Sequence, residues 1–157
     1  MEKDLFEDEI MELVKDIKKQ VNMFFNRFYE PYGLTSVQAL VLIELYKNGD
    51  KTIKELSETL DMGKSNLSPL CKRLEAGGFL RRERDEKDQR VVHISLTQYG
   101  RETLRDIQSH IESRCIPPLQ SCGLQERETI IKGLRLLNSV MKCASETSDG
   151  LQGESIK

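Results

Sequence analysis

Apolar and polar residues follow two different periods in the middle of the chain. Between residues 53 and 76 the apolar positions recur at steps of three and four, as on one face of a helix. Val92, Ile94 and Leu96 instead recur at steps of two, as on one face of a strand. The pattern predicts two short helices, followed by a strand, a charged turn and a second strand.

Local signals mark where these helices begin and end. Thr52 and Glu55 have the spacing of a capping box, which predicts a helix from about residue 53. The turn at residues 61–63 separates it from a second helix over about residues 64–76. Pro69 removes one backbone donor inside this second helix, so we expect the helix to be short or bent at its start.

The second predicted helix has two chemically different faces. One face is apolar and should be buried: Leu67, Leu70, Cys71 and Leu74. The other carries small polar groups followed by cations: Lys64, Ser65, Asn66, Ser68, Lys72 and Arg73. Hydroxyl and amide groups near a helix N-terminus can approach base edges, and cations can meet phosphates. We therefore expect this to be a DNA recognition helix. Helix capping by Ser65 or Ser68 and a solvated cationic face are the alternatives.

The charged segment between the two predicted strands should form the tip of a β-hairpin. Arg90 at its base suits a narrow minor groove, where negative potential attracts arginine, and Lys87 should serve the same loop. Asp88 could hold the Arg90 guanidinium by a bidentate pair, and an ion pair with Asp85 is also compatible with insertion. Helices and hairpin together predict a mainly α fold with a small β-hairpin wing, a winged helix-turn-helix.

Two motifs in this region resemble a known family. The wing pattern D-x-x-D-x-R (Asp85, Asp88, Arg90), followed by S-L-T-x-x-G over residues 95–100, is similar to the signature of the MarR family of transcription regulators. The run over residues 65–75 is similar to the OhrR and MgrA branch of that family. The resemblance covers about residues 5–145. It implies a homodimeric, sequence-specific DNA-binding regulator, most often a repressor, which binds a pseudo-palindromic operator and is released by a small-molecule effector.

The OhrR and MgrA branch places a reactive cysteine in its first helix, and this chain has none before Cys71. Cys71 lies on the apolar stripe and is expected to be a core residue. A thiol-based redox-sensing regulator remains an alternative that would use Cys115 or another late cysteine. A winged-helix protein-interaction module without DNA binding is the other alternative, because a fold does not imply its function.

Apolar stripes predict the elements outside the winged region. Helices are expected over about residues 5–29, 36–47, 98–115 and 125–144, with a short strand at 51–52. Pro117-Pro118 should interrupt the chain after the third of these helices. The expected parts are an N-terminal dimerisation helix (1–34), the winged DNA-binding domain (35–100), C-terminal dimerisation helices (101–145) and a disordered tail (146–157).

Aromatic residues gather where the first helix ends. They are Phe24, Phe28, Tyr29 and Tyr32. The family resemblance implies an effector pocket between the dimerisation helices and the winged domain, and these residues are its candidates. Ordinary aromatic packing in the core is the alternative.

Composition limits the remaining possibilities. The 157 residues carry a net charge of −2, but residues 62–101 contain nine Lys/Arg and five Asp/Glu, so a basic module lies on an acidic body. Two histidines without clustered carboxylates predict no metal site, and no catalytic set or phosphate loop is present, so we expect neither an enzyme nor a cofactor. No run of about 18 apolar residues exists, and the acidic N-terminus is unlike a signal peptide, so we expect a cytoplasmic protein.

Overall fold

The computed structural model describes residues 5–149, with side chains described as far as residue 144. The chain forms two compact units, of which the first ends at Glu112 and the second begins at Ser113. The first unit contains a winged helix-turn-helix, and the second is helical. This mainly helical fold with a small antiparallel sheet confirms the predicted fold class.

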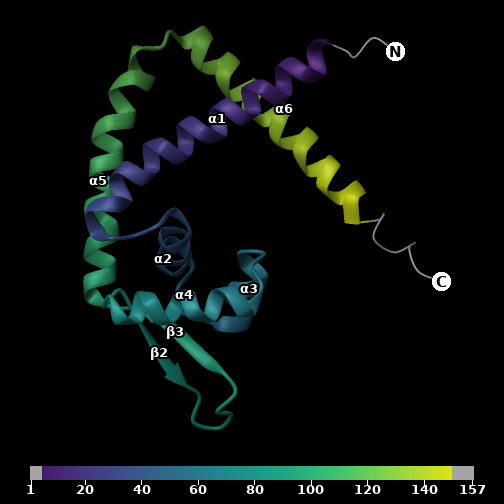
Figure 1. Cartoon of the computed structure of the whole chain (residues 1–157). Helices are drawn as coiled ribbons and strands as arrows, with labels where there is room; N and C mark the ends of the chain where they lie inside the picture. Colours follow the sequence, from purple (N-terminus) through teal and green to yellow (C-terminus); the bar gives the residue numbers. More distant parts are fainter. Residues whose placement is uncertain (1–4, 150–157) are drawn as a thin grey trace, which may run out of the picture. The chain divides into compact units, whose positions relative to one another are not determined.

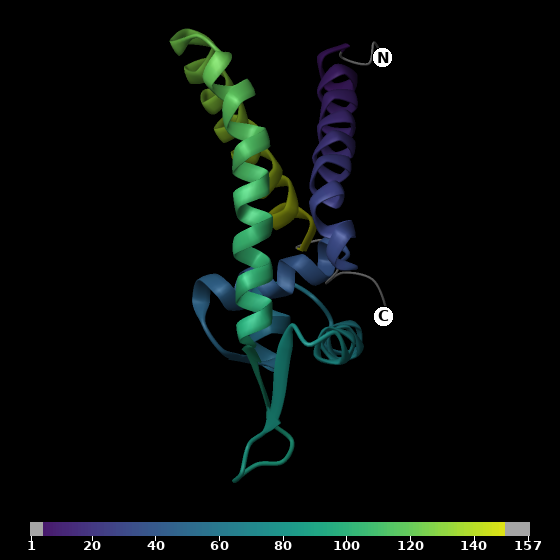
Figure 2. The ribbon, with the colours of Figure 1, turned by 90° about the vertical axis from the view of Figure 1, so that its left-hand side faces the viewer.

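The first unit contains most of the elements. In chain order they are α1 (Leu5–Tyr29), η1 (Glu30–Tyr32), α2 (Ser36–Asn48), β1 (Lys51–Thr52), α3 (Ile53–Thr59), α4 (Lys64–Ala76), β2 (Leu80–Arg84), β3 (Val92–Leu96) and the first part of α5 (Gln98–Ser121). The hairpin of β2 and β3 extends away from helices α2, α3 and α4 (Figures 1 and 2). This hairpin is the wing, and the charged loop that joins its two strands lies at its far end.

The sheet has three antiparallel strands in the order β1-β3-β2. Strand β3 is therefore central, and Ile94 pairs with Lys51 on one side and with Arg82 on the other. Its alternating pattern is confirmed, because Ile94 and Leu96 are buried whereas His93 is exposed. Strand β2 lies at an edge of the sheet, so one row of its backbone groups faces away from β3.

The core of the first unit is built from leucine-rich helix faces and the inner face of the sheet. Fully buried side chains include Leu42, Leu45, Leu56, Leu67, Leu74 and Ile94. The predicted apolar stripe of α4 is buried throughout, as expected, and α2 contributes four buried residues at the centre. Burying large aliphatic side chains supplies about 1.5–3 kcal/mol each, which is the main force that holds α4 on α2, α3 and β2.

Local capping signals set the helix starts. The side chains of Thr35 and Thr52 each accept a hydrogen bond from the backbone N–H three residues later. The side chains of Gln38 and Glu55 in turn accept the backbone N–H groups of Thr35 and Thr52. These two capping boxes confirm the predicted starts of α2 and α3. In the turn before α4, Asp61 adopts a left-handed conformation with φ of 49°, which Asp tolerates better than most residues.

Pro69 does not shorten α4, so the first of its two expected effects, a short helix, is not observed. Helix α4 runs from Lys64 to Ala76 with Pro69 inside it. The proline ring fixes φ near the helical value, so the chain can remain helical, and the cost is one missing backbone donor together with crowding of the ring against the carbonyl group four residues earlier. Leu67, Leu70 and Leu74 are buried on the same helix, and their packing offsets that loss.

The second unit contains the last part of α5 and the whole of α6 (Leu124–Asp149). Two expectations for this part of the chain were wrong. Pro117 and Pro118 lie inside α5, which continues to Ser121, because proline φ suits a helix. Helix α6 includes residues 146–149 of the predicted disordered tail. Residues 143–149 contain neither glycine nor proline, so one residue after another can join an existing helix. The rest of that predicted tail, 150–157, lies outside the described residues.

No helix in the described part of the chain combines the length and the apolar character that crossing a bilayer requires.

Candidate nucleic-acid interface

The polar face of α4 lies opposite its buried stripe, as the sequence predicts. Lys64, Ser65, Asn66, Lys72 and Arg73 are exposed, and Ser68 is half-buried. The N-cap of α4 is Gly63 and makes no side-chain cap, so neither serine is used for capping. Across residues 5–149 none of these six side chains makes a hydrogen bond or ion pair. Their donors and charges are therefore available to a ligand.

The wing loop is organised by the carboxylate of Asp85. Its Oδ1 atom accepts the backbone N–H groups of Lys87 at 2.8 Å and Asp88 at 2.9 Å. Those two N–H groups and the neighbouring His93 ring, 3.3 Å from Oδ2, hold the pKa of Asp85 below its ordinary value. The loop closes where Val91 donates its N–H to the Asp88 carbonyl oxygen at 2.9 Å. Lys87 and Arg90 are thus carried on a turn of defined shape.

The predicted bidentate pair between Asp88 and the Arg90 guanidinium is absent. The Asp88 carboxylate instead accepts the backbone N–H of Arg90 at 3.0 Å. Aspartate in a tight turn often bonds the amide two residues on, and this local bond forms in place of the side-chain pair. Within the described residues no ion pair holds the exposed Arg90 guanidinium, so the predicted pair with Asp85 is also missing.

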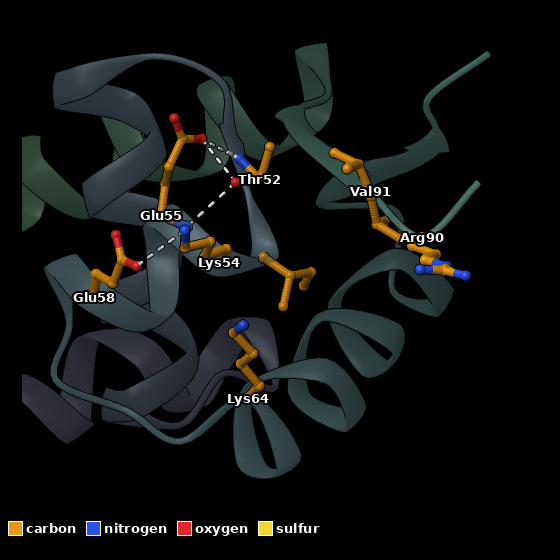
Figure 3. Close-up of a pocket in the computed structure, with 9 residues that line it drawn as sticks. Thr52, Lys54, Glu55, Glu58, Lys64, Arg90 and Val91 are labelled. Carbon is orange, nitrogen blue, oxygen red and sulfur yellow. Dashed lines mark hydrogen bonds and ion pairs between the residues drawn. The ribbon is translucent and has the colours of Figure 1, made fainter. Parts of the chain in front are cut away.

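A groove of about 620 Å³ lies between the start of α3, the start of α4 and the base of the wing. Its lining includes the cations Lys54, Lys64 and Arg90, and Figure 3 shows them on the three elements that surround it. We call this the cationic groove. Its two carboxylates are already engaged. Glu55 accepts the Thr52 N–H at 2.7 Å, and Glu58 lies 3.9 Å from the Lys54 ammonium.

Lys54 is the residue of this groove that sequence reasoning missed. It stands in the first turn of α3, and its exposed side chain lines the same groove as Lys64 and Arg90, where it forms a solvent-exposed pair with Glu58. The only signal in the sequence was a lysine on the polar side of a short amphipathic helix, which is common on any surface. The packing of α3 against α4 and the wing is what gives Lys54 this position.

The base of the wing is fixed by a close approach of two backbone segments. The Thr97 N–H donates to the Phe79 carbonyl oxygen at 3.1 Å, and the Thr97 hydroxyl donates to the Gly78 carbonyl oxygen at 2.6 Å. Gly100 donates its N–H to the Thr97 Oγ1 atom at 3.0 Å. A Cβ atom on Gly100 would lie 2.1 Å from the Phe79 carbonyl oxygen, so only glycine fits there.

A second cavity, of about 430 Å³, is mostly apolar and lies between α1, α2 and α5 in the first unit. Its lining is Phe25, Tyr29, Ile43, Tyr46, Lys47, Leu104, Ile107, Gln108 and Ile111. Of the four aromatic candidates for the effector pocket, only Tyr29 lines this cavity. Phe25 and Tyr29 are four residues apart and share one face of α1, where their rings stack.

The other three aromatic candidates make contacts elsewhere. Phe24 packs on Phe28 with ring centroids 4.9 Å apart. The Tyr32 hydroxyl donates a hydrogen bond to the Asp106 carboxylate, which raises the pKa of Tyr32 to about 12. Burial raises the pKa of Tyr29, which is a buried residue of this lining.

The cysteines differ in their exposure. Cys71 is buried, which confirms its predicted place in the core, and burial raises the pKa of its thiol to about 11. A thiol with that pKa is almost entirely protonated at neutral pH and is a poor nucleophile. Cys115 and Cys122 are half-buried and Cys143 is exposed. Among residues 5–149 no group of side chains has the composition of a metal site.

Comparison with known proteins places the geometry in context. A family model described as "Transcriptional regulator SarA/Rot" matches residues 12–107. The chain is 32% identical over 133 residues to the HTH-type transcriptional regulator MgrA of Staphylococcus aureus, which covers 84% of this chain and 87% of MgrA. A MarR family protein from Bacillus stearothermophilus is 25% identical with a TM-score of 0.74, and the match covers 90% of this chain and 99% of that one.

AbfR of Staphylococcus epidermidis is a further structural neighbour. Its disulfide-formed structure is 28% identical with a TM-score of 0.65, and the match covers 90% of this chain and 97% of that one. Its reduced form has been solved bound to DNA. That structure is 23% identical with a TM-score of 0.66 over 87% of this chain and 94% of that one, which supports the fold alone.

Proposed function

The chain belongs to the SarA/Rot family of transcriptional regulators and is a MarR-like winged-helix protein, and from this premise we propose that it acts as a homodimeric repressor of a pseudo-palindromic operator. DNA binding and transcriptional regulation follow from the family, which is not enzymatic. The repressor role, the dimer and the control by an effector are the proposed part. The observation that supports it best is the row of unengaged polar and cationic side chains on α4 beside the cationic groove.

We propose that α4 enters the major groove and that the wing follows the adjacent minor groove. Ser65, Asn66 and Ser68 stand in the first turns of α4, where short polar side chains can reach base edges. Lys72 and Arg73 lie further along the helix and suit phosphates. Arg90 suits the minor groove because its guanidinium has no internal partner among residues 5–149.

The cationic groove suits a phosphate backbone that passes between α4 and the wing. Lys54, Lys64 and Arg90 line it from three elements, so a single strand could contact all three. Phosphate contacts fix the register of a protein on a duplex, and base contacts then supply the specificity. The cationic groove would then fix the position of the protein on the DNA, and the exposed first turns of α4 would contact the bases that determine specificity.

Exposed apolar faces support the homodimer. Helix α1 carries a stripe of exposed large apolar side chains: Phe6, Leu13, Ile17 and Val21. In the second unit, Ile116, Leu119, Ile130, Ile131 and Leu134 line an apolar groove of about 420 Å³. Large exposed apolar surfaces of this kind mark interfaces. A twofold dimer would place two recognition helices on two half-sites about one helical turn apart.

The apolar cavity of the first unit is the proposed effector site. Its aromatic and aliphatic walls suit a small, mostly apolar molecule, and the Tyr29 and Tyr46 hydroxyls, Lys47 and Gln108 offer a few polar groups at its margin. Such a molecule would displace α1 or α5 relative to the winged region and so change the spacing of the two recognition helices.

The test is an unbiased selection of DNA sequences by the purified full-length protein, followed by binding measurements across a salt series. The proposal expects a twofold-symmetric consensus and a dissociation constant of roughly 10⁻⁸ M or below at moderate salt. Sedimentation should show a dimer. A protein that enriches no sequence and binds scrambled DNA equally well would contradict the proposal and favour a winged-helix protein-interaction module.

Thiol-based redox sensing is a second candidate, favoured by the disulfide-formed structure of AbfR. In this chain it would use Cys115 or Cys122, which are half-buried, since Cys71 is buried and protonated. Treatment with hydrogen peroxide should then change operator binding in the native protein and leave it unchanged in a Cys115→Ser/Cys122→Ser variant. Equal sensitivity in both proteins would exclude these two cysteines, and a native protein whose binding does not respond to peroxide would exclude this candidate.

A further inference from the structure

Glu75 occupies a position that is unfavourable for a carboxylate. It lies in the last turn of α4, where the negative end of the helix dipole repels an anion. Two contacts compensate this repulsion. One carboxylate oxygen accepts the backbone N–H of Arg82 in β2 at 3.0 Å, and the other lies 3.5 Å from the Arg82 guanidinium. One side chain of the recognition helix therefore holds both the backbone and the side chain of a wing residue.

The contact closes an open edge of the sheet. Arg82 stands in the middle of β2 and pairs with Ile94 of β3. Strand β2 is an edge strand, so the backbone N–H of Arg82, which donates to Glu75, has no carbonyl group of another strand of this sheet to bond with. The carboxylate takes the place of water at this point. It links the end of α4 to the middle of the strand that leads into the wing loop.

Burial of the Arg82 side chain gives its pair with Glu75, which is 40% exposed, more weight than the Arg81–Glu83 pair of the same strand. The Arg82 side chain is 17% exposed, and its Nε atom is buried without a hydrogen-bond partner among residues 5–149. A guanidinium so removed from water depends on the one carboxylate that faces it. The neighbouring pair of Arg81 and Glu83 is more than 60% exposed on both side chains and links β2 to no other element.

We propose that Glu75 is a positioning residue that fixes the wing relative to the recognition helix. Helix α4 carries the side chains for the major groove, and β2 leads to the loop that carries Arg90. A shift of β2 along α4 would change the distance between the polar side chains of α4 and Arg90 on the wing loop. The helix and the wing could then no longer contact the same DNA at the same time. The proposal rests on the proposed function, and it adds a residue that touches no DNA.

The first measurement concerns the free protein and needs no DNA. Amide-resolved hydrogen exchange compares the full-length protein with Glu75→Ala and with the matched control Glu83→Ala, which removes the same charge from β2. Loss of one hydrogen bond should speed exchange at the Arg82 amide roughly tenfold in Glu75→Ala and not in the control. Glu75→Gln keeps an oxygen acceptor and should restore most of the protection. Unchanged exchange at Arg82 in Glu75→Ala would overturn the proposal.

The second measurement is a double-mutant cycle with Arg90→Ala on the selected DNA site. Glu75→Ala and Arg90→Ala should each weaken binding about tenfold, and the double variant should weaken it about twentyfold rather than a hundredfold, because a displaced wing has already lost its Arg90 contact. Glu83→Ala should combine with Arg90→Ala multiplicatively. A merely structural role of Glu75 would not produce this coupling.

The outcomes separate this proposal from the proposed function. Multiplicative effects of Glu75→Ala and Arg90→Ala, with faster exchange at Arg82, would overturn the positioning role and leave the DNA-binding function intact. A wild-type protein without specific DNA binding would overturn both, and the exchange at Arg82 would then report only a structural contact. If Glu75→Ala does not fold, the same cycle with Glu75→Gln should show a smaller coupling that follows the part of the Arg82 protection this variant loses, and lost protection without coupling would overturn the proposal.

Discussion

Replacing Gly100 with alanine should destabilise the protein through one identifiable contact. The new Cβ atom would lie 2.1 Å from the Phe79 carbonyl oxygen and 3.0 Å from its carbonyl carbon, whereas real Cβ atoms essentially never come closer than 3.0 Å to such atoms. Both atoms belong to the backbone, so no flexible side chain can move aside. Either the start of α5 or the segment before β2 must shift by close to 1 Å, to judge from these separations.

The magnitude follows from what that shift would break. The Phe79 carbonyl oxygen accepts the Thr97 N–H at 3.1 Å, and the neighbouring Gly78 carbonyl oxygen accepts the Thr97 hydroxyl at 2.6 Å. Weakening two hydrogen bonds at about 1 kcal/mol each, and adding a methyl group to a filled site, gives a loss of roughly 2–3 kcal/mol. The better helix propensity of alanine returns less than about 1 kcal/mol, because Gly100 lies in the first turn of α5. The free energy of unfolding should therefore fall by roughly 2 kcal/mol.

Urea unfolding followed by circular dichroism would measure this difference, with both proteins at the same concentration because a dimer's stability depends on it. Gly133→Ala is the matched control, since a Cβ there meets nothing within 4 Å in α6. The control should leave stability unchanged or raise it by up to about 1 kcal/mol. If Gly100→Ala were as stable as the wild type, the close approach of α5 to Phe79 could not be right.

Three further predictions concern the proposed site and the buried thiol. Arg90→Ala should weaken operator binding by at least about 1 kcal/mol, measured by fluorescence anisotropy, and an unchanged affinity in a folded variant would remove Arg90 from the interface. Lys72→Ala should lower the slope of log affinity against log salt by about one for each protomer, and an unchanged slope would make Lys72 a solvated surface residue. Cys71, with its pKa raised to about 11, should react with iodoacetamide much more slowly than Cys143 at pH 8, as resolved by mass spectrometry of peptides, and should speed up as the pH rises toward 11. Equally fast alkylation of both thiols would show that Cys71 is not buried.

Much of the architecture is determined by the sequence alone because it depends on short-range chemistry. The three- and four-residue steps of Leu67, Leu70 and Leu74 predict the buried face of α4, and the same periodicity places Lys72 on the opposite face. The capping box that begins with Thr52 marks the start of α3, since its bonds span three residues. The alternation around Ile94 predicts the inner face of the wing.

Tertiary structure decided which distant side chains meet. Arg90 comes to share a groove with Lys54 because α3, α4 and the wing pack on one core, and no local pattern encodes that distance. Glu75 faces Arg82 for the same reason. Periodicity shows which residues lie on a common face of one element, but contacts between elements depend on how those faces pack.

Proline and aromatic residues show the same difference between what the sequence predicts and what tertiary packing decides. Pro117 suggested a break, but its fixed φ is also that of a helix, and whether the chain continues depends on the balance of the whole helix. The aromatic cluster at the end of α1 was visible in the sequence, yet only Tyr29 and Phe25 line the cavity. A cavity is defined by the elements around it, so its lining depends on the packing of α1, α2 and α5, which the sequence of α1 alone does not contain.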